Sequence, residues 1–363
     1  MLKSILRDRL LISLVIVSLL LKIFSLNPSW VERYYTFGFY PVISKTLRAL
    51  FGWIPFSAGD VIYVAAFIYL VFKAWKLIRL LAKRQLKEYL SWILLKKYLK
   101  LVLWIYIVFN VFWGLNYNRQ GIAHQFGLSV RQYTPADLYE LTSALQQKLN
   151  FYASRVDSVK RLSLNENNTL FKEGMAAYKI AAQQYSFLSY SQPSIKPSLL
   201  TYVGNYFGFT GYYNPFTAEA QLKTDVPVFT KPFIVCHEMG HQLGYAKENE
   251  ANFSSYLAGR VSGNVEFRYS VYYDMYRYAM SDLFVYNLPC FIDLKKSEHP
   301  QVKKDNATYR QYLLRSKNAV EPVMSLAYDR YLKMNNQPNG KATYNEVVAW
   351  LIAYMKKYGK DAL

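Results

Sequence analysis

The chain has 363 residues, which is long enough for a membrane-embedded part and one globular domain of ordinary size. Of its formal net charge of +20, residues 1–118 carry +12, from 16 Lys and Arg minus 4 acids, and the rest carries +8. Because the excess lies beside apolar runs, it is typical of topology signals and lipid headgroup contacts, and it argues against nucleic acid as a partner. The two cysteines, Cys236 and Cys290, exclude a disulfide-rich scaffold and a cysteine-rich zinc cluster.

Three apolar runs predict three transmembrane helices, at residues 10–26, 61–78 and 98–115. Segment 73–100 holds nine Lys and Arg and one acid, whereas residues 27–60 hold three Lys and Arg and two acids. Since short basic loops stay in the cytoplasm, segment 73–100 and the N-terminus, which carries Lys3 and Arg7, are expected there. Everything after a third span is then expected outside the cytoplasm, in a periplasm if the cell has one, with the lipid bilayer as a partner.

Two alternatives to this topology stay open. The first run has the form of a signal peptide, although residues 27–30 after it offer no cleavage site with small residues. One of the weaker runs can instead be a helix in the membrane interface, which would place the rest of the chain in the cytoplasm.

Residues 119–363 are predicted to form one extracytoplasmic domain behind a transmembrane region of residues 1–118. The segment 134–137, Thr-Pro-Ala-Asp, has the residues of a helix N-terminus and predicts a helix to about residue 156. Short aromatic and β-branched runs between glycines predict a small sheet within residues 194–229. Further helices are expected near residues 170–187, 247–261, 266–288, 306–335 and 343–358. The fold class is therefore mainly α, with an α-rich α+β domain behind the membrane helices.

A candidate metal-binding motif is the segment His-Glu-Met-Gly-His at residues 237–241. His237 and His241 are four residues apart, so on a helix they lie on one face and both imidazoles can reach one metal ion. Glu238 points to the adjacent side, where its carboxylate can take a proton from a metal-bound water. Two solvated helical histidines are the alternative. The other histidines, His124 and His299, have no partner at ligand spacing and are interpreted as surface or core residues.

A catalytic zinc normally has three protein ligands and one water molecule. The segment after the motif offers two carboxylates, Glu248 and Glu250, for the third place. Glu248 and Asn252 are four apart on the expected next helix, so Glu248 is the preferred ligand and Asn252 the group that hydrogen-bonds a ligand histidine. Glu250 stays the alternative.

The motif and the following E-N-E-A-N segment resemble the gluzincin metallopeptidases, in which a Glu-x-x-x-Asp/Asn helix supplies the third zinc ligand. The blocks GYYNPFTAEA, CHEMGHQLGYAKENEANF and YLKMNNQ are similar to an uncharacterised family of bacterial inner-membrane proteins, a domain of unknown function with this motif behind transmembrane helices. This resemblance implies a zincin-like fold and a place in the inner membrane, with no assigned substrate. Lys247 stands where metzincins have their third histidine, and Lys231 and Gln242 flank the motif, so a metzincin site and cleavage within the bilayer are disfavoured.

The sequence thus predicts a membrane-anchored hydrolase whose Zn²⁺ activates water, with Glu238 as general base, to cleave a peptide or protein substrate. A tyrosine, histidine or arginine should stabilise the oxyanion. Candidates for that role are Tyr212, Tyr213, Arg268 and Tyr269, and candidates to face a peptide at the sheet edge are Tyr212, Tyr213, Asn214 and Glu219, with ordinary turn and surface positions as the alternative. A zinc amidase for cell-wall peptides and a non-catalytic, membrane-tethered sensor are the rival functions, although a purely structural zinc has no need of Glu238.

Overall fold

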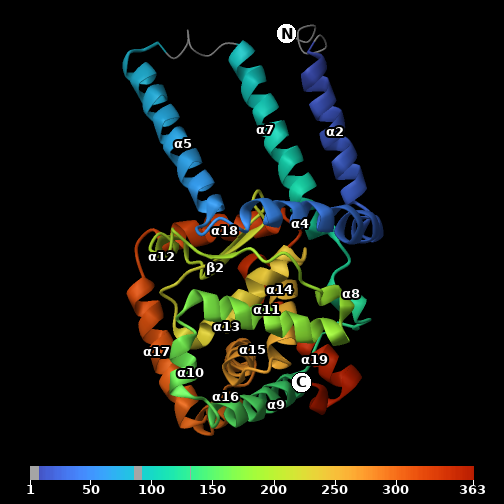
Figure 1. Ribbon diagram of the computed structural model, residues 1–363, viewed down its shortest axis with the longest axis vertical. Helices are drawn as coiled ribbons and strands as arrows, with labels where there is room; N and C mark the ends of the chain where they lie inside the picture. The colour runs from blue at the N-terminus through green and yellow to red at the C-terminus, as the bar shows by residue number, and fades with distance from the viewer. Residues whose placement is uncertain (1–7, 86–91, 131) are drawn as a thin grey trace.

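The computed structural model describes residues 8–85, 92–130 and 132–363, most of them helical. Figure 1 shows a domain of packed helices from which three helices project side by side. The projecting helices are α2 (Arg9–Ser25), α5 (Ala58–Ala82) and α7 (Trp92–Phe112). Their apolar side chains are largely exposed, so the domain core does not cover them.

The prediction of three transmembrane helices is wrong. Among the described helices, α5 alone is long and apolar enough to cross a membrane, and none of its apolar window is buried. The number rises to two if α2 and the helical segment Pro28–Phe51, bent by 97°, are taken as one span. α2 has only 17 residues, and α7 carries Lys96, Lys97 and Lys100 in its first half, so neither meets the requirement by itself. Lys3 and Arg7, which flank the first run, lie outside the described residues.

After α2 the chain turns and lies flat on the domain as α3 (Pro28–Trp30), the π-helix η1 (Val31–Phe39) and α4 (Tyr40–Phe51) (Figure 1). Asn27 caps this segment by accepting a hydrogen bond from the backbone N–H of Trp30, and Pro28 occupies the first turn. On α4 the polar side is the buried one: its buried residues are Tyr40, Ser44 and Arg48. The apolar side of α4 therefore faces away from the domain.

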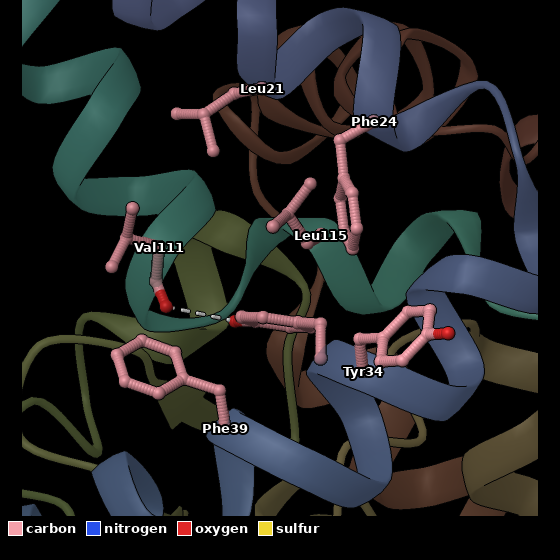
Figure 2. A pocket seen from close by; sticks show the side chains of 7 residues that line it. Leu21, Phe24, Tyr34, Phe39, Val111 and Leu115 are labelled. Atoms are coloured by element: carbon pink, nitrogen blue, oxygen red, sulfur yellow. Dashed lines mark hydrogen bonds between the residues drawn. The ribbon is translucent and has the colours of Figure 1, made fainter.

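An apolar cavity of about 230 Å³ lies where α2, η1 and the end of α7 meet (Figure 2). It is lined by Leu21, Phe24, Tyr34, Tyr35, Phe39, Val111 and Leu115. The hydroxyl of Tyr35 donates to the backbone carbonyl of Val111 at 3.0 Å. This hydrogen bond ties the flat segment to the base of α7.

The core of the domain surrounds α15 (Val265–Tyr286), which packs against α9 (Pro135–Ala153), α13 (Lys231–Gln242) and α14 (Glu248–Arg260). α9 begins as the sequence predicts, because Thr134 and Asp137 form a reciprocal capping box. The other helices of the domain are α8 (Ile122–Gln125), α10 (Ser158–Ser163), α11 (Asn167–Gln184), α12 (Gly204–Phe207), α16 (Leu288–Lys296), α17 (Pro300–Ser316), α18 (Glu321–Met334) and α19 (Val347–Tyr358). Short 3₁₀ turns are η2 (Gly114–Asn118), η3 (Ser186–Leu188), η4 (Val228–Thr230), η5 (Gly340–Glu346) and η6 (Lys360–Ala362).

A three-stranded sheet lies within the region where a small sheet was predicted. Its strands are β1 (Ile195–Pro197), β2 (Gly211–Asn214) and β3 (Glu219–Leu222). β3 is central, parallel to β1 and antiparallel to β2, so β2 is an edge strand. The predicted zincin-like α+β domain is nevertheless wrong, because strands of three or four residues are a minor part of a helical domain.

Candidate metal centre

The candidate metal centre is built on the contact between α13 and α14. Pro232 lies in the first turn of α13, and every residue of this helix is buried. Gly240 permits the close approach of α14, because a Cβ atom at this position would lie 2.2 Å from Ser254 Oγ. The contact brings the start of α14 to the two histidines of α13.

His237, His241 and Glu248 form one buried cluster, in which one possible ligand atom from each residue lies within 4.8 Å of the others. Glu248 Oε2 is 3.2 Å from His237 Nε2 and 3.7 Å from His241 Nε2. Two imidazole nitrogens and one carboxylate oxygen are a ligand set that suits a catalytic zinc ion, with a fourth position left for water. The predicted ligands are therefore close enough to share one ion.

Both imidazole rings are held by hydrogen bonds at Nδ1, while Nε2 faces Glu248. His237 Nδ1 donates to Asn252 Oδ1 at 2.8 Å, and His241 Nδ1 donates to the backbone carbonyl of Tyr245 at 2.7 Å. Asn252 Nδ2 in turn donates to the carbonyl of Tyr344 at 3.1 Å, which fixes the orientation of the amide. Hydrogen bonds of this kind select the tautomer that leaves each Nε2 lone pair free for a metal ion.

The charges at the cluster also suit a cation. Glu248 Oε2 is buried and has no hydrogen-bond partner within the described residues, although it faces both imidazoles. Burial opposes ionisation of Glu248, yet the neighbouring imidazoles of His237 and His241 hold its pKa below the ordinary value. A buried anion of this kind requires a positive partner, and a metal ion between the three residues would provide it.

Glu238 lies beside this cluster, against the edge strand β2. A Cβ atom at Gly211 would lie 2.5 Å from Glu238 Oε1, so only glycine leaves room for the carboxylate here. Glu238 Oε2 is buried without a hydrogen-bond partner among the described residues. Burial raises the pKa of Glu238 to about 8, a range in which a carboxylate can accept and return a proton.

The alternative ligand Glu250 points to another part of the domain. A Cβ atom at Gly121 would lie 2.0 Å from Glu250 Oε1, which places this carboxylate beside the segment after α7. Burial raises the pKa of Glu250, and the nearby Arg119 guanidinium opposes this shift. Glu250 is thus separate from the histidine pair, while Glu248 lies with it.

The other candidates from the sequence are held elsewhere by hydrogen bonds. Tyr212 donates to Asp60, and the Tyr213 hydroxyl is hydrogen-bonded to that of Tyr40. Arg268 donates to the carbonyl of Ser262, and Tyr269 donates to Asp305. Asn214 accepts from the N–H groups that follow it, Glu219 accepts from the first N–H groups of α5, and the His299 ring accepts from Gln301. These side chains are therefore committed to structural contacts.

Three residues near the C-terminus complete the cluster and were missed in the sequence. Tyr328 on α18 donates to Glu248 Oε1 at 2.7 Å, and its hydroxyl lies 3.3 Å from that of Tyr344. The ring of Tyr344 lies parallel to that of His237, with centroids 6.3 Å apart. Gln337 Oε1 accepts from the backbone N–H of Glu248 at 3.0 Å. Of the three, only Gln337 lies in a block named from the sequence, YLKMNNQ, which ends at this residue.

Comparison with known proteins gives one family. The profile of the family described as "Protein of unknown function (DUF3810)" matches residues 35–352, which include the candidate metal centre and the projecting helices α5 and α7. No curated protein and no solved structure matches the chain. The expected membership in an uncharacterised family is confirmed, and the chain belongs to the DUF3810 family.

Proposed function

We propose that this protein is a membrane-anchored, zinc-dependent metallopeptidase. The observation that carries the proposal is the convergence of His237 Nε2, His241 Nε2 and Glu248 Oε2 in a buried cluster, with Glu238 beside it. Asn252 supports the proposal because it directs the His237 ring toward Glu248. A structural zinc site would have no need of a buried carboxylate beside its ligands.

The proposed reaction uses a general base, two tyrosine hydroxyl groups and the edge of a strand from the chain, together with the zinc ion. When bound, zinc would polarise the scissile carbonyl and lower the pKa of a water molecule. Glu238 takes a proton from this water and returns it to the leaving amine. We assign stabilisation of the oxyanion to the hydroxyl groups of Tyr328 and Tyr344, which lie beside Glu248. An extended peptide added to the free edge of β2 would run past Glu238 at Gly211.

We further propose that the domain lies outside the cytoplasm, in the periplasm of a bacterium. Glu219 in the domain accepts hydrogen bonds from the backbone N–H groups of Ala58 and Gly59, at 3.1 and 2.6 Å, so the domain holds the N-terminal end of α5. Lys83 and Arg84 follow the other end of this helix. Because basic residues remain cytoplasmic, we expect the end of α5 next to Lys83 and Arg84 in the cytoplasm. The domain, which holds the other end of this helix, is then on the far side of the inner membrane.

Metal analysis of the purified protein tests the proposed function. About one zinc per chain is expected in the wild type, and it should be lost in His237→Ala and Glu248→Ala. Glu250→Gln is the matched control, because Glu250 is an equally buried acid on the same helix and should leave the zinc content unchanged. Glu238→Gln should keep the metal and lose peptide hydrolysis. A wild-type protein without metal after zinc is supplied would refute the proposal.

A further inference from the structure

The candidate metal centre is closed to a peptide. None of His237, Glu238, His241 and Glu248 is more than 7% exposed. A peptide bond therefore reaches Glu238 only after a covering element has moved. α18 is such an element, because its residue Tyr328 caps Glu248.

α18 is also the element beside the site that is most lightly held. Of its 14 residues Leu332 alone is buried, whereas twelve of the 13 residues of α14 are buried. Its contacts are mainly with α12 and η5. An element that buries so little apolar surface opens at low free-energy cost compared with the core helices. α18 thus has the properties of a movable cover.

The outer side of α18 carries exposed apolar residues, with the charged residues Arg330 and Lys333 beside them. Leu326 is two residues from Tyr328, about 160° round the helix, so it points away from the metal centre. Leu326 is 54% exposed, Val323 66% and Met334 85%. If the domain were surrounded by water, these apolar side chains would be exposed to it. An exposed apolar surface on the helix that covers the site instead indicates contact with a partner or a membrane.

This apolar side lies at the level where α5 leaves the domain. In Figure 1, α18 and α12 lie at the end of the domain from which α5 projects. The backbone N–H of Leu199, just before α12, donates to Asp60 in the first turn of α5 at 2.7 Å. Exposed aromatic residues surround this point: Tyr202 near α12 is 79% exposed, and Trp53 just before α5 is 78% exposed. Exposed Trp and Tyr at the base of an apolar helix are typical of the membrane interface.

We propose that α18 rests in the membrane interface as the cover of the metal centre, and that substrate reaches the centre from the membrane side, beneath α18. The substrate class is then a polypeptide anchored in the same membrane and cut close to the bilayer surface. This inference rests on the proposed function. It adds the direction of access, the moving element and the class of substrate. Because Tyr328 is on the cover, closure over a bound peptide also returns the hydroxyl to the centre.

The position of α18 is tested by fluorescence quenching. Single cysteines are introduced as Val323→Cys and Met334→Cys in a Cys290→Ser background, labelled, and placed in phosphatidylcholine and phosphatidylglycerol vesicles with nitroxide-labelled acyl chains. Roughly twofold or greater quenching is expected, because an interfacial helix buries its apolar face about 5–10 Å into the headgroup and acyl boundary. Val159→Cys is the matched control. Val159 is apolar, 77% exposed and on α10, away from the end that bears α5 (Figure 1), and it should remain unquenched.

The substrate class is tested with one peptide sequence presented in two ways in the same vesicles. It is placed either directly after a transmembrane anchor or after a Gly/Ser spacer of about 30 residues, which spans roughly 30 Å. Zinc-loaded protein should cut the adjacent sequence at least about tenfold faster, because only that sequence is concentrated at the membrane-side opening. Glu238→Gln gives the background for both peptides.

The outcomes separate the two proposals. Absence of quenching at residues 323 and 334 would overturn the position of α18, whether or not the protein hydrolyses peptides. Equal cleavage of the adjacent and distant sequences would overturn the substrate class and leave the metallopeptidase intact. No cleavage of either peptide by zinc-loaded protein would overturn the proposed function and the substrate class together, while the quenching still decides where α18 lies.

Discussion

Replacing Asn252 with alanine should weaken zinc binding without unfolding the protein. The change removes the acceptor of the 2.8 Å hydrogen bond from His237 Nδ1 and the donor to the carbonyl of Tyr344. Loss of a hydrogen bond that orients a ligand histidine typically lowers metal affinity about 10- to 100-fold. A loss of this size corresponds to about 1.4 to 2.7 kcal/mol of binding free energy. Asn252 is fully buried, so water cannot easily replace the lost acceptor.

The assay is competition for zinc between the detergent-purified protein and a chromophoric chelator. Asn249→Ala is the matched control, because Asn249 is a buried asparagine on the same helix whose amide donates to Glu346 and to no histidine. Asn252→Asp keeps an acceptor for His237 and should restore most of the affinity. Wild-type affinity in Asn252→Ala, or an equal loss in Asn249→Ala, would refute the assigned role of Asn252.

Three further substitutions test the geometry. Gly240→Ala should release zinc and lower the free energy of unfolding by up to about 2 kcal/mol, because overpacking of the added Cβ atom, 2.2 Å from Ser254 Oγ, outweighs the gain in helix propensity. Ser254→Ala removes this Oγ atom and should restore zinc binding and stability; no rescue would contradict this. Gly211→Ala should leave the zinc content unchanged and slow hydrolysis about 100-fold, because its Cβ atom would displace Glu238; an unchanged rate would contradict this. Glu219→Ala should cost about 1–3 kcal/mol by leaving the first N–H groups of α5 without an acceptor, and an unchanged melting temperature in detergent would contradict this.

The parts of the site that lie close together in sequence were accessible from spacing. His237 and His241 share a helix face because they are four residues apart, and Glu248 lies only seven residues beyond the second histidine. Glu248 and Asn252 also occupy one face of α14, which is why spacing selected them together. Local helix geometry therefore predicted the cluster that the structure brings together.

The parts contributed from far along the chain were not accessible. Tyr328 is 80 residues from Glu248, and the chain has 34 tyrosines, so no pattern distinguishes it from the others. The oxyanion candidates named from the sequence, such as Tyr212, remain predictions, and the Tyr212 hydroxyl is engaged with Asp60 and Ser198. Tertiary contacts at such separations depend on the packing of α18, which periodicity does not reveal.

The error in the membrane region has a specific physical origin. Average apolarity suggested three spans, but Lys96, Lys97 and Lys100 charge one half of α7, and α2 ends at a 97° bend. α4 was not predicted for a related reason. Its buried side is polar and includes Ser44 and Arg48, so the segment has no apolar run although it lies flat against the domain. Hydropathy reports the mean character of a segment, whereas its orientation depends on which side is apolar.

The end of α13, the helix that carries the two candidate histidine ligands, depends on residues from the N-terminal third of the chain. Tyr40 and Ser44 on α4 both donate to the carbonyl of Gln242, at 3.1 and 3.0 Å, and Trp113 after α7 donates to that of His241 at 3.4 Å. The last carbonyl groups of a helix need such partners when they are buried. Removing residues 1–118 to obtain a water-soluble fragment would therefore uncap α13 one residue from the candidate ligand His241. Tests of the proposed chemistry therefore need the full chain in detergent or lipid, because residues of its N-terminal third are structural parts of the candidate site.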